Sequence, residues 1–329
     1  MRGKKMPQIG RVEISIIEED QSRWLAFGGK ELDVLALPGT FRPQAIGPDG
    51  GLLPRWSGEG VKLYKAIDPD ITYTIFNFRD PVVGGFEPAK LALRRAIIMA
   101  YNVREEIEVV RKGQAVHAQM PIPFGVVGHD PSYRTVNQYD PDLANKLLDR
   151  FGYRKGPDGW RRLPDGKPLV IRQATQTSQI DRTFNELWKK AADAIHVRME
   201  FDAGKFADNL KQAKACRLMM WGAAWTADYP DGENFMQLLY GPNTGQSNNG
   251  CYESKSFDAL YEKMRAMPPD APGRDRLFLE MTRQMDVDGA WAMHVSRERN
   301  QLIRPWVLGY KKHPILHGEW LYMDLAPRP

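Results

Sequence analysis

The stretch MMWGAAWTADYPDGENFMQLL, residues 219–239, decides the fold and the candidate site. Its apolar first part, 218–225, is short and leads into turn residues, which predicts a buried β-strand. Ligand contacts in α/β proteins gather at strand ends and in the loops that follow them. A carboxylate beside an indole can hold an ammonium group. The strand would deliver four residues to such an end, namely Trp225, Thr226, Ala227 and Asp228.

Two ordinary structural explanations apply to the same residues. An Asp directly before the turn Tyr229-Pro230-Asp231-Gly232 is often only a turn former. Paired tryptophans, here Trp221 and Trp225, more often belong to a core than to a ligand surface. The residue types alone leave both explanations open beside the ammonium site.

Length and composition predict a globular protein with two lobes. A chain of 329 residues is long for a single hydrophobic core. Its apolar content of 42% is ordinary, and its formal net charge of +5 is small. Basic residues alternate with acidic ones, as in Arg297-Glu298-Arg299, so we expect solvated helix faces and no nucleic-acid surface. No run of eighteen apolar residues occurs, so no membrane-spanning helix is expected.

The sequence lacks the common catalytic and cofactor motifs. It contains no GxSxG nucleophile elbow, no GxGxxG and no GxxxxGK[ST] phosphate loop. Its six histidines are scattered and no CxxC occurs, so neither a metal site nor a cofactor is expected. Cys216 and Cys251 could pair in an oxidising compartment, but spacing alone does not establish a disulfide. Binding without catalysis is the better expectation.

Hydrophobic periodicity changes in character along the chain. Roughly the first seventy residues favour sheet, with strands over 12–17, 31–37, 61–66 and 72–77 and a helix over 20–27. Pro88 begins an amphipathic helix, and a second helix is expected from Val103 to Gly113. Asp140 and Pro141 predict the start of a helix that ends at Gly152. Strands and helices then alternate over 169–174, 179–195, 197–201, 203–215 and 218–225, which is typical of an α/β lobe.

Six blocks in a fixed order resemble family 5 of the bacterial extracellular solute-binding proteins, which includes peptide-binding components of ABC transporters. The blocks include Ala100-Tyr101-Asn102-Val103-Arg104, Tyr139-Asp140-Pro141 and Trp225-Thr226-Ala227-Asp228-Tyr229-Pro230. The first of these blocks begins earlier, at Phe76-Asn77-Phe78 with Pro81. The other three are the proline-rich loop from Pro121 to Gly128, Asn248-Asn249 with Tyr252, and Phe257-Asp258 with Leu260. The resemblance as a whole extends over essentially all residues from Val12 to the C-terminus.

The resemblance implies an α/β, bilobed periplasmic-binding-protein (Venus-flytrap) architecture of type II, in the large cluster with peptide-binding topology. Residues 1–72 would be the latter, mostly sheet part of lobe I, 73–300 would be lobe II, and 301–329 a return strand segment to lobe I. Relative to the family, the first lobe would be incomplete because its N-terminal part, signal peptide included, is absent. Exposed sheet edges and marginal stability are therefore expected.

The resemblance also implies that the protein captures a solute and does not act as an enzyme. The family's Trp-x-x-Asp motif matches Trp225 and Asp228, so Asp228 would hold the α-amine of a peptide. The other expected ligand-binding residues are Thr226, Ala227, Tyr229, Asn248 and Asn249. The polar loop 240–252 that contains the last two could line the cleft or simply face solvent.

Partners and compartment follow from the same resemblance. The expected partners are a peptide or small-molecule solute and ABC permease subunits, the expected location is the periplasm, and the chain is expected to be monomeric. Three alternatives stay open: the same scaffold with a nickel chelate, haem or sugar; a truncated fragment that binds nothing; and a cytosolic α/β enzyme.

Two further expectations concern arginines and a helix end. Arg94, Arg95 and Arg104 belong to a helix pair that packs the lobe, so we expect them to be scaffold. His196 stands where the family usually has a glycine after this helix. A left-handed helix end accepts His less readily than Gly, at a cost of about 1 kcal/mol.

Overall fold

The chain divides into two compact units, each with its own sheet. A computed structural model describes every residue except 1–2, 4, 316–317 and 329. Unit 1 comprises Met1–Asp68, Arg111–Val116 and Arg297–Pro329, and unit 2 comprises Pro69–Val110 and His117–Ser296. The sequence had placed the divisions at 72 and 300 and had missed the 111–116 segment, which runs through unit 1.

The sheet of unit 1 is antiparallel and has β9 at its centre. Strand β9 (Val295–Ile303) pairs with β1 (Val34–Ala36), β2 (Lys62–Ile67) and β4 (Ala115–His117). The sequence had not predicted β9. The remaining elements of this unit are α1 (Asp20–Gly28), η1 (Gly39–Phe41), α2 (Arg42–Ala45), α3 (Pro54–Gly58), β10 (Val307–Leu308), η4 (Glu319–Tyr322) and β11 (Asp324–Leu325).

An aromatic cluster forms the core of unit 1. Trp24 meets Trp56 edge to face with ring centroids 5.0 Å apart, and Phe27 lies 5.7 Å from Trp56. The guanidinium of Arg304, only 1% exposed, lies 4.3 Å from the centre of the Phe27 ring. It also bonds to Glu59 at 2.8 Å, so the buried charge is paired.

The strand predicted over residues 12–17 does not form. This segment pairs with no strand among the described residues, and Ile14 and Ile16 are 74% and 91% exposed. Alternating β-branched residues favour an extended chain, yet a strand also needs a neighbouring edge to complete its hydrogen bonds.

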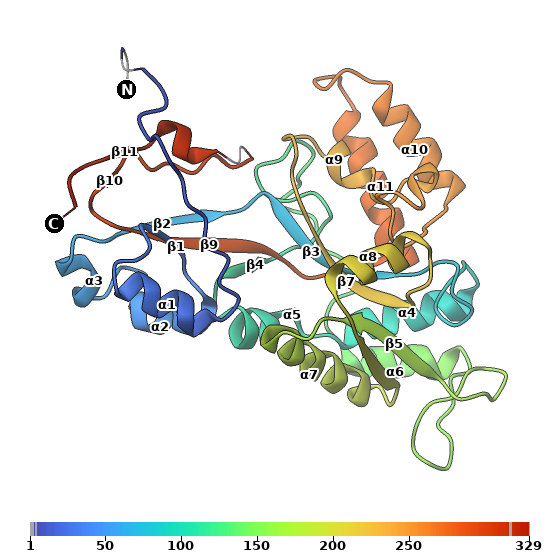
Figure 1. Cartoon of the computed structure of the whole chain (residues 1–329). Helices are drawn as coiled ribbons and strands as arrows, with labels where there is room; N and C mark the ends of the chain where they lie inside the picture. The colour runs from blue at the N-terminus through green and yellow to red at the C-terminus, as the bar shows by residue number, and fades with distance from the viewer. Residues whose placement is uncertain (1–2, 4, 316–317, 329) are drawn as a thin grey trace. The chain divides into compact units, whose positions relative to one another are not determined.

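The sheet of unit 2 is mixed and carries the predicted strand–helix alternation (Figure 1). Its strand order is β6-β5-β7-β3-β8. Strand β5 runs parallel to β6 and β7, whereas β3 runs antiparallel to β7 and β8. The strands are β3 (Asp70–Phe76), β5 (Val170–Thr175), β6 (Arg198–Ala203), β7 (Met220–Thr226) and β8 (Trp291–Met293).

Helices pack on and beside this sheet. In Figure 1, α4 and α6 lie together and α10 runs beside α11. Asp140 accepts the Leu143 N–H at 2.8 Å and Pro141 opens α6, as the sequence predicted. The helices of unit 2 are α4 (Pro88–Ala100), α5 (Val103–Glu105), α6 (Pro141–Arg150), α7 (Gln179–Ala194), α8 (Phe206–Lys214), α9 (Glu233–Met236), α10 (Lys255–Arg265) and α11 (Arg274–Asp288), with the short 3-10 turn η3 (Gly241–Asn243).

The second helix of the predicted pair is shorter than expected. After α5 the chain takes a π-helical turn, η2 (Glu106–Val110), and does not continue as α-helix to Gly113. Glu106 is 1% exposed, accepts a hydrogen bond from the Tyr101 hydroxyl at 2.9 Å and lies 2.9 Å from His294 Nδ1. A wider turn accompanies this buried, bonded carboxylate, a feature that hydrophobic periodicity does not reveal.

Two contacts hold segments of unit 2 together, of which the sequence predicted the first. Arg94 is fully buried and donates to the carbonyls of Val83, Gly85 and Asp288 at 2.6–3.0 Å, which ties α4 to the end of α11. Cys216 and Cys251 form a disulfide, which settles the pairing that spacing alone left open.

Candidate functional site

The Trp-Asp stretch forms β7 and the loop after it. Thr226 pairs with Asp70 and Trp225 with Ile71, so the stretch lies at the start of β3. Only the first two residues of β7, Met220 and Trp221, are buried, and Trp225 is half-buried. The prediction of a buried strand was right only for its first part, because the next three residues are Gly222, Ala223 and Ala224, which have little side chain to anchor this part of the strand in a core. The half-buried indole of Trp225 therefore has one part free for contact.

A single buried amide fixes the candidate site. Asn234, in α9, is 2% exposed, and its Oδ1 accepts the indole N–H of Trp225 and the backbone N–H of Asp228, each at 3.0 Å. Its Nδ2 donates to Asp228 Oδ2 at 3.0 Å. Because two N–H donors meet one atom and a carboxylate meets the other, the amide can have only this orientation. Asn234 thus holds the indole and the carboxylate side by side.

Asp228 differs from its acidic neighbours Asp231 and Glu233, because only one of its two carboxylate oxygens has a hydrogen-bond partner among the described residues. Asp231 forms a two-pronged ion pair with Arg274 at 2.7 and 2.9 Å, and Glu233 accepts the hydroxyl protons of two tyrosines, Tyr229 and Tyr261. Among the described residues, Asp228 Oδ1 has no hydrogen-bond partner and its carboxylate has no ion pair. An exposed, uncompensated carboxylate held rigidly at one oxygen can accept from an ammonium group at the other.

The other predicted residues of the stretch play different parts. Ala227 is 2% exposed and its N–H bonds to the Pro69 carbonyl at 2.9 Å, so its side chain packs inside. Thr226 is the last residue of β7 and is half-buried. Tyr229 is 43% exposed. Burial, followed by its bond to Glu233, raises the pKa of Tyr229 to about 12, so its hydroxyl stays protonated.

Asn248 and Asn249 lie at the opposite end of β7 from Asp228. Their loop bonds to the chain just after β3, where the Gly250 carbonyl accepts the Phe78 N–H at 2.9 Å. Phe76 pairs with Met220, at the other end of the strand from Thr226. The two ends are six residue steps apart along the strand, which is about 20 Å. The structure therefore does not bring these asparagines to Asp228.

The Asn248 side chain is committed to its own loop. It is 0% exposed, its Nδ2 donates to the carbonyls of Tyr240 and Tyr252 at 3.1 and 2.8 Å, and its Oδ1 accepts the Tyr252 N–H at 3.3 Å. Asn249 is half-buried. We assign Asn248 to loop structure and do not carry either asparagine into the amine site.

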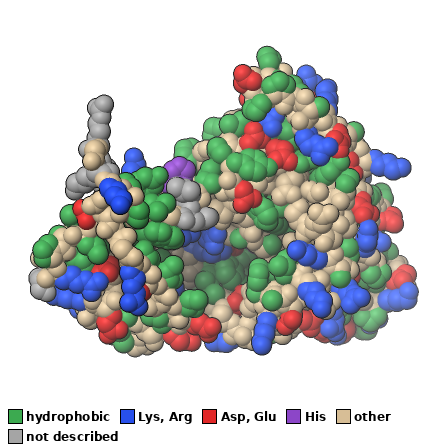
Figure 2. Space-filling model, turned by 45° about the horizontal axis from the view of Figure 1, so that its top comes forward, with side chains coloured by type: hydrophobic (Ala, Val, Ile, Leu, Met, Phe, Trp, Pro, Cys, Tyr) green, Lys and Arg blue, Asp and Glu red, His purple; other side chains and the backbone are tan. Residues whose placement is uncertain are grey.

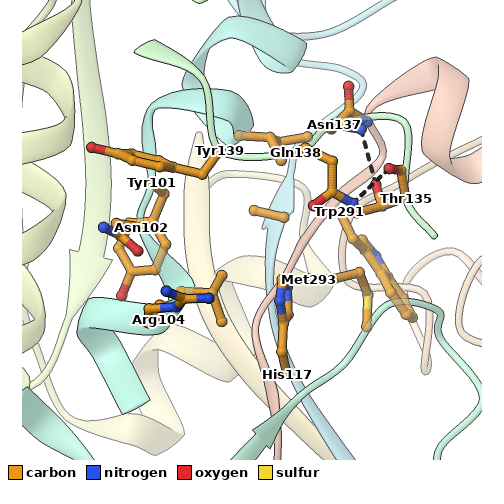
Figure 3. Close-up of a pocket in the computed structure, with 13 residues that line it drawn as sticks. Tyr101, Asn102, Arg104, His117, Thr135, Asn137, Gln138, Tyr139, Trp291 and Met293 are labelled. Atoms are coloured by element: carbon orange, nitrogen blue, oxygen red, sulfur yellow. Dashed lines mark hydrogen bonds between the residues drawn. The ribbon is translucent and has the colours of Figure 1, made fainter. Parts of the chain in front are cut away.

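Unit 2 also contains a pocket that the sequence did not indicate. It measures about 380 Å³ and lies between the end of α4, α5, the 135–139 segment and β8. Figure 3 shows Asn102 and Arg104 on one side of it and His117, Met293 and Trp291 on the other. Arg104 is exposed here, so its assignment to the scaffold was wrong. Sequence periodicity placed it on a packing helix, but the helix stops one residue later.

Other site classes receive no support from the described part of the chain. Within it, no three His, Cys, Asp or Glu side chains gather in a way that could hold a metal ion. Among the same residues, no helix is long and apolar enough to cross a membrane. On the face drawn in Figure 2, basic and acidic side chains are interspersed, which matches the alternating charges of the sequence.

Comparison with known sequences identifies relatives over most of the chain. The sequence pattern of the bacterial extracellular solute-binding proteins, family 5 Middle, matches residues 2–247. Heme-binding protein A of Haemophilus influenzae is 25% identical over 255 residues, covering 77% of this chain and 42% of the relative. Di/tripeptide-binding protein 2 of Pseudomonas aeruginosa is 27% identical over 232 residues, covering 68% of this chain and 40% of the relative. The chain thus spans about two-fifths of the length of these relatives.

Comparison with solved structures gives the fold. The periplasmic binding protein DppA of Helicobacter pylori, in complex with the peptide STSA, superposes with a TM-score of 0.76 at 19% identity, over 94% of this chain and 56% of that one. The oligopeptide-binding protein AppA of Bacillus subtilis, in complex with a nonapeptide, superposes with a TM-score of 0.79 at 13% identity, over 95% of this chain and 60% of that one. NikZ of Campylobacter jejuni, in complex with Ni(L-His), superposes with a TM-score of 0.77 at 14% identity, over 94% of this chain and 60% of that one. The chain therefore has the α/β fold of periplasmic binding proteins of the peptide-binding type.

Proposed function

Because the chain belongs to the bacterial extracellular solute-binding proteins of family 5, we propose that it captures a solute for an ABC importer in the periplasm. Its partners are then the solute and the permease subunits of that importer. Relatives whose names specify di- and tripeptide binding support a peptide as the solute. On this proposal the chain binds and releases its solute without chemical change.

One observation carries the proposal for a peptide with a free α-amine. Asp228 is exposed, unpaired among the described residues and held by Asn234 next to the half-buried indole of Trp225. An ammonium group seated there would donate to Asp228 Oδ1 and lie against the indole, so ionic and cation–π attraction would act together. Hydrogen bonds to a charged group contribute about 1.5–3 kcal/mol, and exposure of Asp228 places this one toward the lower value.

The second candidate is a non-peptide solute on the same scaffold. One curated relative is a haem-binding protein and one solved relative holds Ni(L-His). The two candidates differ in what Asp228 does, because a free-amine ligand would lose its ionic contact with Asp228 on N-acetylation, whereas a ligand without an amine would not.

The test is calorimetric titration of the purified chain with a pool of short peptides, followed by mass spectrometry of the retained ligand. We expect uptake from the free-amine pool and recovery of unaltered peptides. The control is the same pool after N-acetylation, which removes the ammonium charge and keeps the rest of each peptide. Equal heats from both pools, or cleaved peptides in the bound fraction, would overturn the proposal.

A further inference from the structure

The pocket of about 380 Å³ in unit 2 is separate from the Asp228 site. Its lining comes from the end of α4, α5, β4, the 135–139 segment and β8. Strand β8 pairs with one edge of β3, while β7, which leads to Asp228, pairs with the other edge. Tyr73, for example, lies opposite both Met293 and Ala223. The two sites are therefore at least two strand spacings, about 10 Å, apart.

The pocket lining offers hydrogen-bond donors. Asn102 Oδ1 already accepts the Glu105 N–H at 3.2 Å, which leaves the Asn102 amide N–H groups for other partners. His117 Nδ1 lies 3.0 Å from Gln119 Nε2, whose amide orientation is set because Gln119 Oε1 accepts the Thr135 N–H and Gln138 Nε2, each at 3.2 Å. The His117 Nδ1 must therefore accept, and the ring proton lies on Nε2.

The carboxylates near the pocket are already engaged with other groups, and the buried Glu106 accepts from the Tyr101 hydroxyl and lies 2.9 Å from His294 Nδ1. The lining contains no Asp or Glu. The nearby Asp286 is occupied, since it accepts from Thr135 Oγ1 at 2.6 Å and from Asn137 Nδ2 at 2.7 Å, and Glu105 is paired with Lys190 at 2.7 Å. Arg104 is exposed, and within the described residues it has no ion-pair partner. Its fixed positive charge is thus available to a ligand.

Aromatic side chains contribute part of the pocket wall. Trp291 is 3% exposed and is held in place by stacking on Tyr73, with ring centroids 3.9 Å apart. Tyr101 is 3% exposed, whereas Tyr139 is 52% exposed. Two buried rings and one exposed ring suit a flat apolar group, and a volume of this size is typical of small-molecule sites.

We propose that this pocket is a second binding site, for a small aromatic carboxylate, with Arg104 and the Asn102 amide receiving the acid and Tyr101, Tyr139 and Trp291 the ring. The site adds to the proposed amine site and does not depend on it, because all of its lining belongs to unit 2 and none of it to β7 or the loop after it. Arg104 recognises the ligand's charge, and the aromatic walls recognise its shape.

The test uses indole-3-acetate as the probe and the full chain as the protein. We expect calorimetry to show saturable binding of indole-3-acetate and at least tenfold weaker binding of indole-3-acetamide, which has the same ring without the charge. Arg104→Gln should weaken the binding of indole-3-acetate at least tenfold and bring its affinity close to that of indole-3-acetamide. Tyr139→Ala should weaken the binding of both probes by a similar factor, because it removes an aromatic ring from the pocket lining without changing the charge.

Two variants serve as controls. Arg154→Gln removes an exposed arginine of unit 2 outside the pocket and should leave the affinity for indole-3-acetate within twofold of the original. Asp228→Asn should also leave it unchanged, which separates this proposal from the amine site. Equal affinity for acid and amide, equal weakening by Arg104→Gln and Arg154→Gln, or no saturable binding by a chain with unchanged melting temperature would each overturn the proposal.

Discussion

The amide of Asn234 orients both side chains of the proposed amine site. It bonds the Trp225 indole N–H and the backbone and carboxylate of Asp228, and it is 2% exposed. A buried amide in such a network cannot rotate without leaving a donor or acceptor unpaired, which costs about 1–3 kcal/mol. Asn234 is therefore a positioning residue for the candidate site.

Asn234→Asp tests this role with almost no change in size. The substitution keeps an acceptor for Trp225 but replaces the donor to Asp228 with a second carboxylate, so it repels Asp228 and turns it away. We expect the affinity for a free-amine peptide to fall at least tenfold, measured by calorimetry. The N-acetylated peptide should bind the variant and the original chain alike. A drop of equal size for both peptides would show a loss of folding, and no drop for either would contradict the role.

At the residue scale, the sequence identified part of the candidate site. Trp225 and Asp228 were predicted because an indole and a carboxylate at a strand end have a recognisable chemistry. Asn234 was missed, since an asparagine after a turn has many ordinary explanations. Arg104 was misassigned, because nothing in its neighbours shows that Glu106 enters the core and ends the helix. Buried polar bonds of this kind depend on contacts between distant segments.

The residue after the end of helix α7 is left-handed, as predicted from the glycine that the family usually has at this position. His196 has φ 58°, a conformation that costs a residue with a Cβ about 1 kcal/mol relative to glycine. His196→Gly should therefore raise the free energy of unfolding by about 1 kcal/mol and the melting temperature by a few degrees. His196→Ala is the matched control, since it removes the same ring but keeps the strained Cβ. If both variants are stabilised equally, the ring and not the backbone is responsible.

The Cys216–Cys251 disulfide ties the end of α8 to the loop before α10. It closes a sequence separation of 35 residues, and next to it the Asn77 side chain donates to the Cys216 carbonyl at 2.8 Å. Loss of a bridge over such a loop typically lowers stability by about 3 kcal/mol. We expect this loss for the Cys216→Ser, Cys251→Ser double variant in denaturant titration. Reductant should destabilise the original chain by a similar amount and leave the double variant unchanged; an effect of reductant on the variant would contradict this explanation.

At the element scale, strands were predicted well where one face is apolar and poorly elsewhere. The central strand β9 reads VSRERNQLI, and its charged residues hid it from hydrophobic alternation. Those residues are satisfied in the sheet: Arg299 pairs with Asp68 at 2.6 Å, and Asn300 donates to Gln114 at 2.7 Å. Residues 12–17 show the converse, an apolar alternation without a partner strand. Pairing is a property of two segments and cannot be read from one.

For the molecule as a whole, stability should fall on mild acidification. Partial desolvation, followed by neighbouring positive groups, lowers the pKa of both His117 and His196 in the folded chain. As pH falls through about 6.5, the two histidines are therefore protonated in the unfolded chain before they are protonated in the folded chain. The contribution of the two neutral histidines to the free energy of unfolding, which is fully present above that pH, is then lost. We expect a lower free energy of unfolding at pH 5.5 than at pH 7.5, measured in denaturant.

The comparison variant for this prediction is His117→Gln with His196→Gln. Burial raises the pKa of Asp258 and Asp288, which acts in the opposite direction, so only the difference between the two proteins is diagnostic. The double variant should lose less stability between pH 7.5 and pH 5.5 than the original chain. An identical loss in both proteins would show that other groups are responsible.

The most direct measurement for the whole account is a cycle of four titrations. One short peptide, with its amine free or N-acetylated, is titrated into the original chain and into Asp228→Asn. The account predicts that either change alone weakens binding at least tenfold, about 1.4 kcal/mol, and that the second change adds little once the first is made. Independent, additive losses would show that Asp228 and the amine do not meet. Affinity unaffected by either change would contradict the amine site itself.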